Sequence, residues 1–464
     1  MNIAVIGAGY VGLVAAAGFA SVGHRVVCVD LDRRKVDAIN AGRPLLYEAG
    51  LEDIVQRALA DGTLRATMEL ASCASDADAI FICVETPSTA ADGIDLRVIR
   101  ECARGVGEAL RQRPSYCVVA VKSTVVPGTA EDIVGPIVWA AAGKTRSEIG
   151  LVSNPEFLRE GQAVRDFLYP DRIMVGGIDE ASIALVTEIY APFSAPIFAT
   201  TPRTAEMVKY ASNTLWATLV SFSNEIATIC EATPGVDVED VMRAVHLDER
   251  LSSAGPEGRV YPGAVSYLRA GCGFGGSCLP KDVRALIRYA RDAGAQPDLL
   301  SAVMRVNESR PDALVRLVER ALGTLADRPI AVLGLSFKPG TDDLRESPSI
   351  PIIHSLLRQG ARVRAYDPIA QTAARTRWQE SGITICSSAE EALAGAEAAL
   401  VLTAWPEFST LDWAGLRGRM ARPLVVDGRR VLDGVALEQA GYEYLCIGRH
   451  AAPVPLRDAS PTAS

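Results

Sequence analysis

The sequence predicts an α/β protein in which two Rossmann-like, doubly wound parallel-sheet domains are joined by a helical middle domain. Short apolar runs rich in β-branched residues alternate with helical patterns from the first residues onward, and this alternation begins again after Pro329. Between the two regions, residues 203–232 form one long helical pattern with no glycine or proline inside it. Alternating strands and helices favour a parallel sheet that is covered by helices.

The N-terminal domain is predicted to span residues 1–200 and to bind a dinucleotide. Its expected strands are residues 3–6, 26–29, 79–84 and 117–121, and its expected helices include residues 11–22 and 96–110.

The middle domain is predicted over residues 201–322, with the long helix at 203–232 as its centre. A second helical run extends from Pro280 to about Gly323 and is interrupted near residues 294–297. The apolar load of the long helix exceeds what one small domain would cover. We therefore expect at least a homodimer, with a higher oligomer as an alternative.

The C-terminal α/β domain is predicted over residues 323–450. Its expected strands are residues 330–333, 363–366, 398–402 and 424–426. Residues 451–464 are rich in Ala, Pro and Ser, and we expect a flexible tail there.

Composition excludes several classes of function. The net charge of −9 over 464 residues argues against nucleic acid or an anionic membrane as the main partner. No apolar run reaches the roughly 18 residues of a membrane span, and the N-terminus lacks the pattern of a signal peptide. Ten scattered cysteines without a C-x-x-C pair indicate reduced thiols and a cytoplasmic location. The four histidines lack metal-ligand spacing, so no metal site is expected.

A dinucleotide signature opens the chain in the run Gly7-Ala8-Gly9-Tyr10-Val11-Gly12. It follows a predicted strand and begins a predicted helix, and Asp30 ends the next strand. Glycines there let the backbone approach a pyrophosphate, and the acidic residue binds the ribose hydroxyls. Asp30 favours NAD over NADP, because a carboxylate would repel a 2′-phosphate. Lys35, shortly after it, is either a cofactor contact or a solvated surface lysine.

Two further segments follow the third and fourth strands: Glu85-Thr86-Pro87 and Lys122-Ser123-Thr124. Ligands bind at the carboxyl ends of strands in such sheets, so Thr86 and Thr124 are candidates for the cofactor site. The alternative is ordinary turn chemistry.

One cysteine stands out in the segment Gly273-Phe274-Gly275-Gly276-Ser277-Cys278-Leu279-Pro280-Lys281-Asp282. Pro280 suits the first position of a helix, which would place Cys278 near free amides, the positive end of a helix dipole and Lys281. Those surroundings favour the nucleophilic thiolate. The alternative is a glycine-rich loop around a structural cysteine.

Polar pairs with a four-residue spacing, which share one face if the segment is helical, complete the candidate site. We expect a helix to start at Asn154 and Pro155 and to carry the first pair. The pairs are Glu156 with Glu160, Lys209 with Asn213, and Cys278 with Asp282. Together with a nucleotide fold, they form an acid–base–nucleophile set.

These motifs, in this order, resemble the UDP-glucose/GDP-mannose dehydrogenase family from residue 1 to about residue 450. The matching segments are residues 7–12, 123–129, 154–161, 209–213, 273–282 and 336–347. Residues 403–408 and 427–430 resemble the UDP-glucose branch in particular.

The resemblance implies a four-electron oxidation of UDP-glucose at C6 to UDP-glucuronate, with two NAD⁺. Cys278 would attack the intermediate aldehyde, and water would hydrolyse the resulting thioester. The implied catalytic residues are Cys278, Lys209, Asn213, Asp282, Glu156 and Thr124. The implied cofactor contacts add Glu160, Lys281 and Arg345. The implied substrate contacts are Glu156, Lys209, Asn213, Arg250, Tyr267, Leu268, Gly275, Lys338 and Arg429.

The chain departs from the family pattern at two places. The stretch between Arg250 and Tyr267 is longer than usual, so either Arg250 or Arg259 would reach the partner's substrate. Glu85 stands where a small residue is usual and would alter the nicotinamide pocket.

Three alternatives remain open at this point. One keeps the mechanism and changes the substrate to GDP-mannose or another nucleotide sugar. Another is a two-electron β-hydroxyacid dehydrogenase, which needs no nucleophilic cysteine. The third is an NAD-binding scaffold without catalysis.

Overall fold

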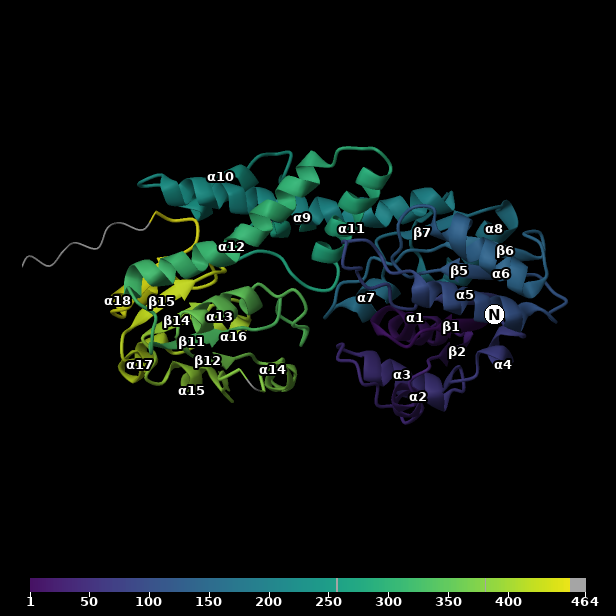
Figure 1. Ribbon diagram of the computed structural model, residues 1–464, viewed down its shortest axis with the longest axis horizontal. Helices are drawn as coiled ribbons and strands as arrows, with labels where there is room; N and C mark the ends of the chain where they lie inside the picture. Colours follow the sequence, from purple (N-terminus) through teal and green to yellow (C-terminus); the bar gives the residue numbers. More distant parts are fainter. Residues whose placement is uncertain (256–257, 380, 451–464) are drawn as a thin grey trace, which may run out of the picture. The chain divides into compact units, whose positions relative to one another are not determined.

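The computed structural model describes residues 1–255, 258–379 and 381–450. The chain divides into two compact units, which are described separately (Figure 1). The first unit contains Met1–Thr214 and Lys281–Pro297, and the second contains Leu215–Pro280 and the chain from Asp298 onward. The predicted tail lies outside the described residues. The predicted functional boundaries near residues 200 and 322 stay predictions.

The first unit is built on an eight-stranded sheet with the order β3-β2-β1-β4-β5-β6-β7-β8. The strands are β1 Asn2–Ile6, β2 Arg25–Val29, β3 Leu64–Thr67, β4 Ala79–Ile82, β5 Cys117–Val121, β6 Ile149–Ser153, β7 Ile173–Gly177 and β8 Ile197–Thr200. The four strands predicted for this domain correspond to β1, β2, β4 and β5 and are confirmed to within two residues, whereas β3, β6, β7 and β8 were not predicted.

The prediction of a parallel sheet needs one correction, at the junction between β6 and β7. These two strands pair antiparallel, whereas every other pair in the sheet is parallel. A parallel return requires an element that crosses the sheet. The only helix between these strands, α7 (Ala163–Leu168), has six residues and extends only about 9 Å. The chain therefore enters β7 from the edge at which β6 ended.

Helices cover both faces of this sheet, as a doubly wound fold requires. Alternate residues of β1 enter different cores: Ile3 and Val5 pack into one, and Ala4 and Ile6 into the other. The helices of the unit are α1 Tyr10–Ser21, α2 Arg33–Asn40, α3 Leu51–Ala60, α4 Leu70–Ala74, α5 Arg97–Leu110, α6 Gly135–Ala142, α7, α8 Glu180–Tyr190 and α11 Leu279–Asp292. One core is centred on Phe19, which contacts the rings of Phe81 and Phe167.

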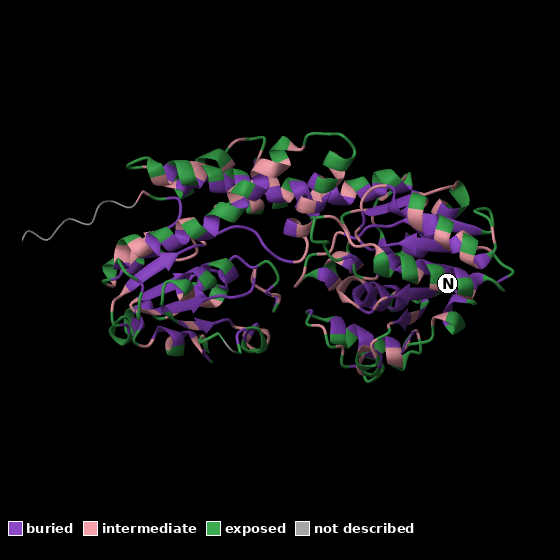
Figure 2. Cartoon of the chain, viewed as in Figure 1, coloured by how far each residue is buried: buried purple, intermediate pink, exposed green. Residues whose placement is uncertain are grey.

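The second unit contains a six-stranded, fully parallel sheet with the order β13-β12-β11-β14-β15-β16. Its strands are β11 Pro329–Leu333, β12 Arg362–Tyr366, β13 Thr384–Ile385, β14 Ala398–Val401, β15 Leu424–Asp427 and β16 Glu443–Cys446. Alternate residues of β11 again enter two cores, with Ile330 and Val332 in one and Ala331 and Leu333 in the other. The central strands are buried in both units (Figure 2).

Other elements of the second unit are largely helical. They are α10 Val238–His246, α12 Asp298–Leu322, α13 Ser349–Arg358, α14 Gln371–Arg377, α15 Ala389–Leu393, α16 Pro406–Ser409, α17 Trp413–Leu416, α18 Gly434–Gln439 and the hairpin of β9 Ser253–Gly255 and β10 Gly258–Val260. The long helix α9, Pro202–Ala232, has 31 residues and contains the division between the units. Both α9 and the interruption between α11 and α12 confirm the predicted pattern.

Candidate active site

The glycines of the dinucleotide signature have different structural roles. A Cβ atom on Gly7, whose φ is +101°, would lie 2.7 Å from the carbonyl oxygen of Cys83, and one on Gly12 would lie 1.8 Å from that of Gly7. These two glycines are required by packing. A Cβ atom on Gly9 would meet no atom within 4 Å, so the surface at the N-terminus of α1 is open there. Helix N-terminal amides bind anions, and this open surface fits a pyrophosphate.

Asp30 directly follows β2 beside this loop and holds the loop in place. Its Oδ2 accepts a 2.7 Å hydrogen bond from the amide of Ala8, and its Oδ1 accepts one of 2.9 Å from Asp32. Lys35 Nζ lies 3.3 Å from Asp30 Oδ2. Asp30 and Lys35 thus lie together at the signature, and their roles at a cofactor ribose stay predictions.

A buried carboxylate, Glu48, links this loop to a second segment. The Tyr10 hydroxyl donates a hydrogen bond to Glu48. Glu48 Oε2 accepts a 2.8 Å hydrogen bond from the amide of Gly161, and Oε1 accepts one of 2.8 Å from the amide of Ala163. Burial, followed by the hydrogen bond to Glu48, raises the pKa of Tyr10 well above its usual range. Sequence reasoning missed Glu48, because nothing local in its loop indicates such distant partners.

The predicted helix at Asn154 and Pro155 is wrong, since the first helix after β6 begins only at Ala163. Asn154 does not cap a helix because its side chain is used elsewhere. Its Nδ2 donates to the carbonyl of Met174 at 2.7 Å, and its Oδ1 accepts from the Tyr190 hydroxyl at 2.7 Å. Glu156 and Glu160 therefore do not share a helix face.

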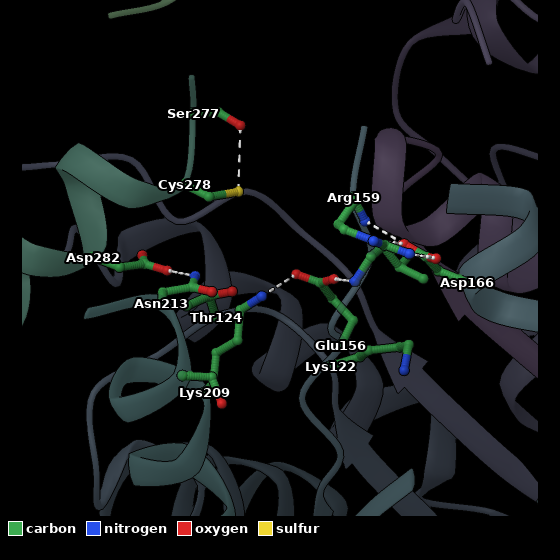
Figure 3. Close-up of polar contacts among 12 residues, drawn as sticks. Lys122, Thr124, Glu156, Arg159, Asp166, Lys209, Asn213, Ser277, Cys278 and Asp282 are labelled. Carbon is green, nitrogen blue, oxygen red and sulfur yellow. Dashed lines mark hydrogen bonds and ion pairs between the residues drawn. The ribbon is translucent and has the colours of Figure 1, made fainter. Parts of the chain in front are cut away.

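Glu156 instead forms a buried ion pair with Lys209 of α9. The Lys209 Nζ and Glu156 Oε1 atoms are 2.7 Å apart, and the side chains are only 4% and 5% exposed (Figure 3). Asn213, one turn along α9 as predicted, donates from Nδ2 to Asp282 Oδ2 at 2.6 Å. Lys281 Nζ lies 2.7 Å from the other oxygen of Asp282. The first unit thus brings together five residues of the predicted set.

Thr86 and Thr124 also meet, because the Thr86 hydroxyl donates to the carbonyl of Thr124 at 2.8 Å. The loop after Thr124 is held by Glu206 of α9, whose carboxylate accepts from the amides of Gly128 and Ala130 at 2.6 and 2.8 Å. Burial raises the pKa of Glu206 to about 7. Sequence reasoning missed this residue, although it precedes Lys209 by a single helical turn.

In the second unit, the glycine–cysteine loop lies directly on the segment around Arg345. A Cβ atom on Gly275 would lie 2.2 Å from the carbonyl oxygen of Glu346, and the amide of Gly276 donates to the Arg345 carbonyl at 2.9 Å. Cys278 is half-buried directly before α11, with its Sγ 3.5 Å from the Ser277 Oγ. Leu279 rather than Pro280 is the first helical residue, so the predicted helix start is wrong by one position.

Arg429 binds the same loop rather than standing apart from it. Its Nε donates to the Leu402 carbonyl at 2.6 Å and its Nη1 to the Gly273 carbonyl at 3.0 Å. Lys338 Nζ lies 5.4 Å from the centre of the Phe337 ring, and Arg345 pairs with Asp343 at 2.8 Å.

The remaining predicted substrate residues lie around α9 and the hairpin. Tyr267 stacks on Trp216 of α9 with ring centres 4.8 Å apart, and Leu268 beside it is buried. Arg250 is 88% exposed and pairs with Asp248, whereas Arg259 donates to the Ser252 hydroxyl at 2.9 Å. Which of the two arginines reaches a partner's substrate stays a prediction. Glu85 is exposed after β4.

Metal binding finds no support among the described residues, where no group of three or more His, Cys, Asp or Glu side chains could hold an ion. All ten cysteines, each within the described ranges, carry thiols rather than disulfides. No helix in the described part of the chain has the length and apolar character needed to cross a membrane.

Comparison with known families matches three successive parts of the chain to one family. Residues 1–194 match the NAD binding domain of the UDP-glucose/GDP-mannose dehydrogenase family, residues 203–309 its central domain, and residues 331–434 its UDP binding domain.

Individual relatives agree over nearly the full length. The UDP-glucose 6-dehydrogenase of Pseudomonas aeruginosa is 41% identical, with 97% of this chain and 98% of that protein covered. The UDP-glucose 6-dehydrogenase TuaD of Bacillus subtilis is 39% identical, with 97% and 94% covered. The structure of a UDP-glucose dehydrogenase from Pyrobaculum islandicum superposes with a TM-score of 0.87 at 40% identity, over 97% of this chain and 98% of that one.

Proposed function

This chain belongs to the UDP-glucose/GDP-mannose dehydrogenase family, and we propose that its site residues oxidise UDP-glucose at C6 to UDP-glucuronate. The overall activity is an NAD-dependent, four-electron oxidation of an alcohol to an acid. The observation that supports the residue assignment best is the bond between Asn213 and Asp282. This bond connects the α9 segment that carries Lys209 and Asn213 to α11, the helix that begins directly after Cys278.

In the first oxidation, Lys209 acts on the C6 hydroxyl. It either stabilises the negative charge that develops on the C6 oxygen or serves as the acid–base group for the hydroxyl proton. Glu156, at 2.7 Å, can accept that proton from Lys209. Asn213 adds a hydrogen bond to the substrate oxygen. NAD⁺ supplies hydride acceptance when it is bound, one molecule for each of the two oxidations.

In the second oxidation, the Cys278 thiolate adds to the C6 aldehyde and gives a thiohemiacetal. Loss of a second hydride from C6 leaves a thioester, and water then displaces the thiol to give the carboxylate. Asp282 and Thr124 position the water, and Glu156 takes its proton. The buried state of Asp282 and Glu156 supports these roles, because exclusion of solvent strengthens their electrostatic effect.

The cofactor is proposed to lie along the signature from Gly7 to Gly12. The surface left open by Gly9 would receive the pyrophosphate, and Asp30 would bind the ribose. Thr86, Glu160, Lys281 and Arg345 are the further cofactor contacts in this proposal. The substrate contacts are Gly275, Tyr267, Leu268, Lys338 and Arg429, with Arg250 or Arg259 reaching a partner's site. The proposed domain boundaries follow these tasks: 1–200 for NAD, 201–322 for catalysis and dimerisation, and 323–450 for UDP.

We propose a homodimer that forms through α9, and a cytoplasmic location. Three large apolar side chains, Leu215, Phe222 and Ile229, are 50%, 48% and 56% exposed on this helix. Their seven-residue spacing places them in one row, which a second copy of the chain would cover. The ten thiols support a reducing compartment.

Cys278→Ser tests the covalent step. The serine enzyme should lose steady turnover of UDP-glucose to the acid, while Cys102→Ser, which changes a half-buried thiol of α5, should keep it. Turnover by Cys278→Ser near the wild-type rate would overturn the mechanism.

GDP-mannose remains the second candidate substrate, because the family to which the chain belongs includes GDP-mannose dehydrogenases. A comparison of kcat/KM over a panel of nucleotide sugars separates the two, and the proposal requires UDP-glucose to rank first.

A further inference from the structure

The backbone at the start of the glycine–cysteine loop, residues 271–274, is held in place by side chains. These residues lie in neither a helix nor a strand. Their backbone groups are bonded by Asn224 of α9, by Asn307 and Arg310 of α12, and by Arg429, all of them in the second unit. Only Arg429 has a role in the proposed function.

Asn307 holds the loop with both ends of its side-chain amide. Its Oδ1 accepts a 2.7 Å hydrogen bond from the Phe274 amide, and its Nδ2 donates to the Phe274 carbonyl at 3.1 Å. The side chain thus pairs with Phe274 as a residue of a neighbouring strand would, and it satisfies two buried backbone groups. The approach is close, because a Cβ atom on Gly273, whose φ is +110°, would lie 2.9 Å from Asn307 Oδ1.

The turn of α12 that carries Asn307 departs from a regular helix. Pro311, inside this helix, has no N–H to donate to the Asn307 carbonyl. Arg310, directly before the proline, donates from Nε to the Gly271 carbonyl at 3.3 Å, so its polar group is also used on the loop. A helix that gives up a hydrogen bond where it holds a loop indicates that the position of the loop matters.

We propose that Asn307 is a positioning residue for Cys278: it fixes the loop at Phe274 and so keeps the thiol in place directly before α11. The inference rests on the proposed function. Amides at the start of a helix stabilise a thiolate only while the sulfur stays beside them. Attack on the C6 aldehyde also requires the sulfur and the carbon to meet in a fixed geometry. In this role Asn307 acts through the loop and needs no contact with substrate.

Alkylation by iodoacetamide measures the reactivity of the Cys278 thiol without substrate. Among the ten cysteines, each of which the structure describes, only Cys102 and Cys278 are not buried, and peptide mass spectrometry separates the two. Asn307→Leu keeps the branched shape of the side chain and removes both hydrogen bonds. In this variant the alkylation rate of Cys278 at pH 7 should fall about tenfold, and that of Cys102 should not change.

Asn40 of α2 provides a matched control, because it forms the same pair of hydrogen bonds elsewhere. Its Nδ2 donates to the Ala66 carbonyl at 3.0 Å, and its Oδ1 accepts from the Ala66 amide at 2.9 Å, on β3 of the first unit. Asn40→Leu should keep the wild-type alkylation rate of Cys278 and the wild-type kcat. Melting temperatures of the two leucine variants measure the loss of stability separately from the loss of reactivity.

Turnover separates the two oxidations. Asn307→Leu should lower kcat for UDP-glucose about tenfold or more, because the sulfur is no longer held where the aldehyde forms. In Cys278→Ser only the first oxidation can proceed, and the added Asn307→Leu change should not slow it, because Asn307 acts through the thiol that is missing. A slower first oxidation in the double variant than in Cys278→Ser alone would assign Asn307 to the fold in general and overturn the proposal.

Unchanged alkylation of Cys278 in Asn307→Leu, or an equal fall in Asn40→Leu, also overturns the proposal. Should Asn307→Leu not fold, Asn307→Asp serves the same comparison, and misfolding of both counts against the proposal. Failure of the wild-type enzyme to oxidise UDP-glucose would instead refute the proposed function, while the alkylation rates, measured without substrate, would still decide the role of Asn307.

Discussion

At the scale of single residues, the site depends on charges held away from water. Lys209 and Glu156 are almost fully buried, and each is the other's ionic partner at 2.7 Å. When a buried pair is broken by removal of one member, the remaining charge loses its compensation. The same contact that supports proton transfer is therefore also a structural requirement, and the two roles must be measured separately.

Lys209→Met should abolish turnover and lower the free energy of unfolding by about 3 kcal/mol, because Glu156 is left buried without its partner. Urea denaturation measures the second effect. The double variant with Glu156→Gln removes both charges and should regain part of the loss. Equal stability of Lys209→Met and wild type would contradict the buried ion pair.

Glu206 makes the free energy of unfolding depend on pH in the direction opposite to that expected for a carboxylate in an ion pair. Its folded pKa is raised from 4.5 to about 7, so its contribution to stability is fully present below pH 4.5 and is lost as pH rises through 7. The change amounts to about 3 kcal/mol. Glu206→Gln should flatten this part of the stability–pH curve, whereas Glu131→Gln, a more exposed neighbour, should not. Parallel curves for wild type and Glu206→Gln would exclude the effect.

At the scale of elements, prediction from sequence succeeded where the pattern is local and failed where partners are distant. The helices α9 and α11 follow from apolar periodicity and from the absence or position of glycine and proline. The segment after β6 does not, because Asn154 bonds to Met174 and Tyr190 rather than capping a helix. Glu48 and Glu206 were missed for the same reason, since each binds backbone amides far along the chain.

Two glycines of the signature loop allow the effect of a substitution on packing to be measured separately from its effect on NAD⁺ binding. Gly9→Ala should keep the wild-type melting temperature, because its Cβ atom meets nothing within 4 Å, yet it should weaken NAD⁺ binding at least tenfold by occupying the pyrophosphate surface. Gly12→Ala should lower the melting temperature, since its Cβ atom would lie 1.8 Å from the Gly7 carbonyl. Calorimetric titration with NAD⁺ measures the binding. Unchanged affinity in Gly9→Ala would place the cofactor elsewhere.

At the scale of the whole molecule, sequence predicted the two α/β regions, four strands in each, and the long helix. It predicted neither the edge strands of the two sheets nor the antiparallel β7. The pattern of β7 is the same in either direction, because residues alternate between the two faces both ways. The homodimer is a proposal, since the structure contains a single chain. The proposal rests on the row of exposed apolar side chains along α9.

Phe222→Glu should convert the dimer to a monomer, because it places a charge in the centre of that row. Phe198→Glu is the matched control, since Phe198 is 58% exposed on β8, away from the row. Light scattering at working concentration distinguishes the two masses. A wild-type protein that is already monomeric, or a Phe222→Glu protein that stays dimeric, would exclude α9 as the interface.

The central claim is that one substrate molecule is oxidised twice at C6 and that Cys278 is covalently bonded to C6 during the second oxidation. Its most direct test is the number of NADH molecules formed per molecule of limiting UDP-glucose, with the product identified at the end point. Two NADH and UDP-glucuronate are expected. One NADH per substrate, with an aldehyde or ketone as the final product, would contradict the claim and indicate a two-electron dehydrogenase.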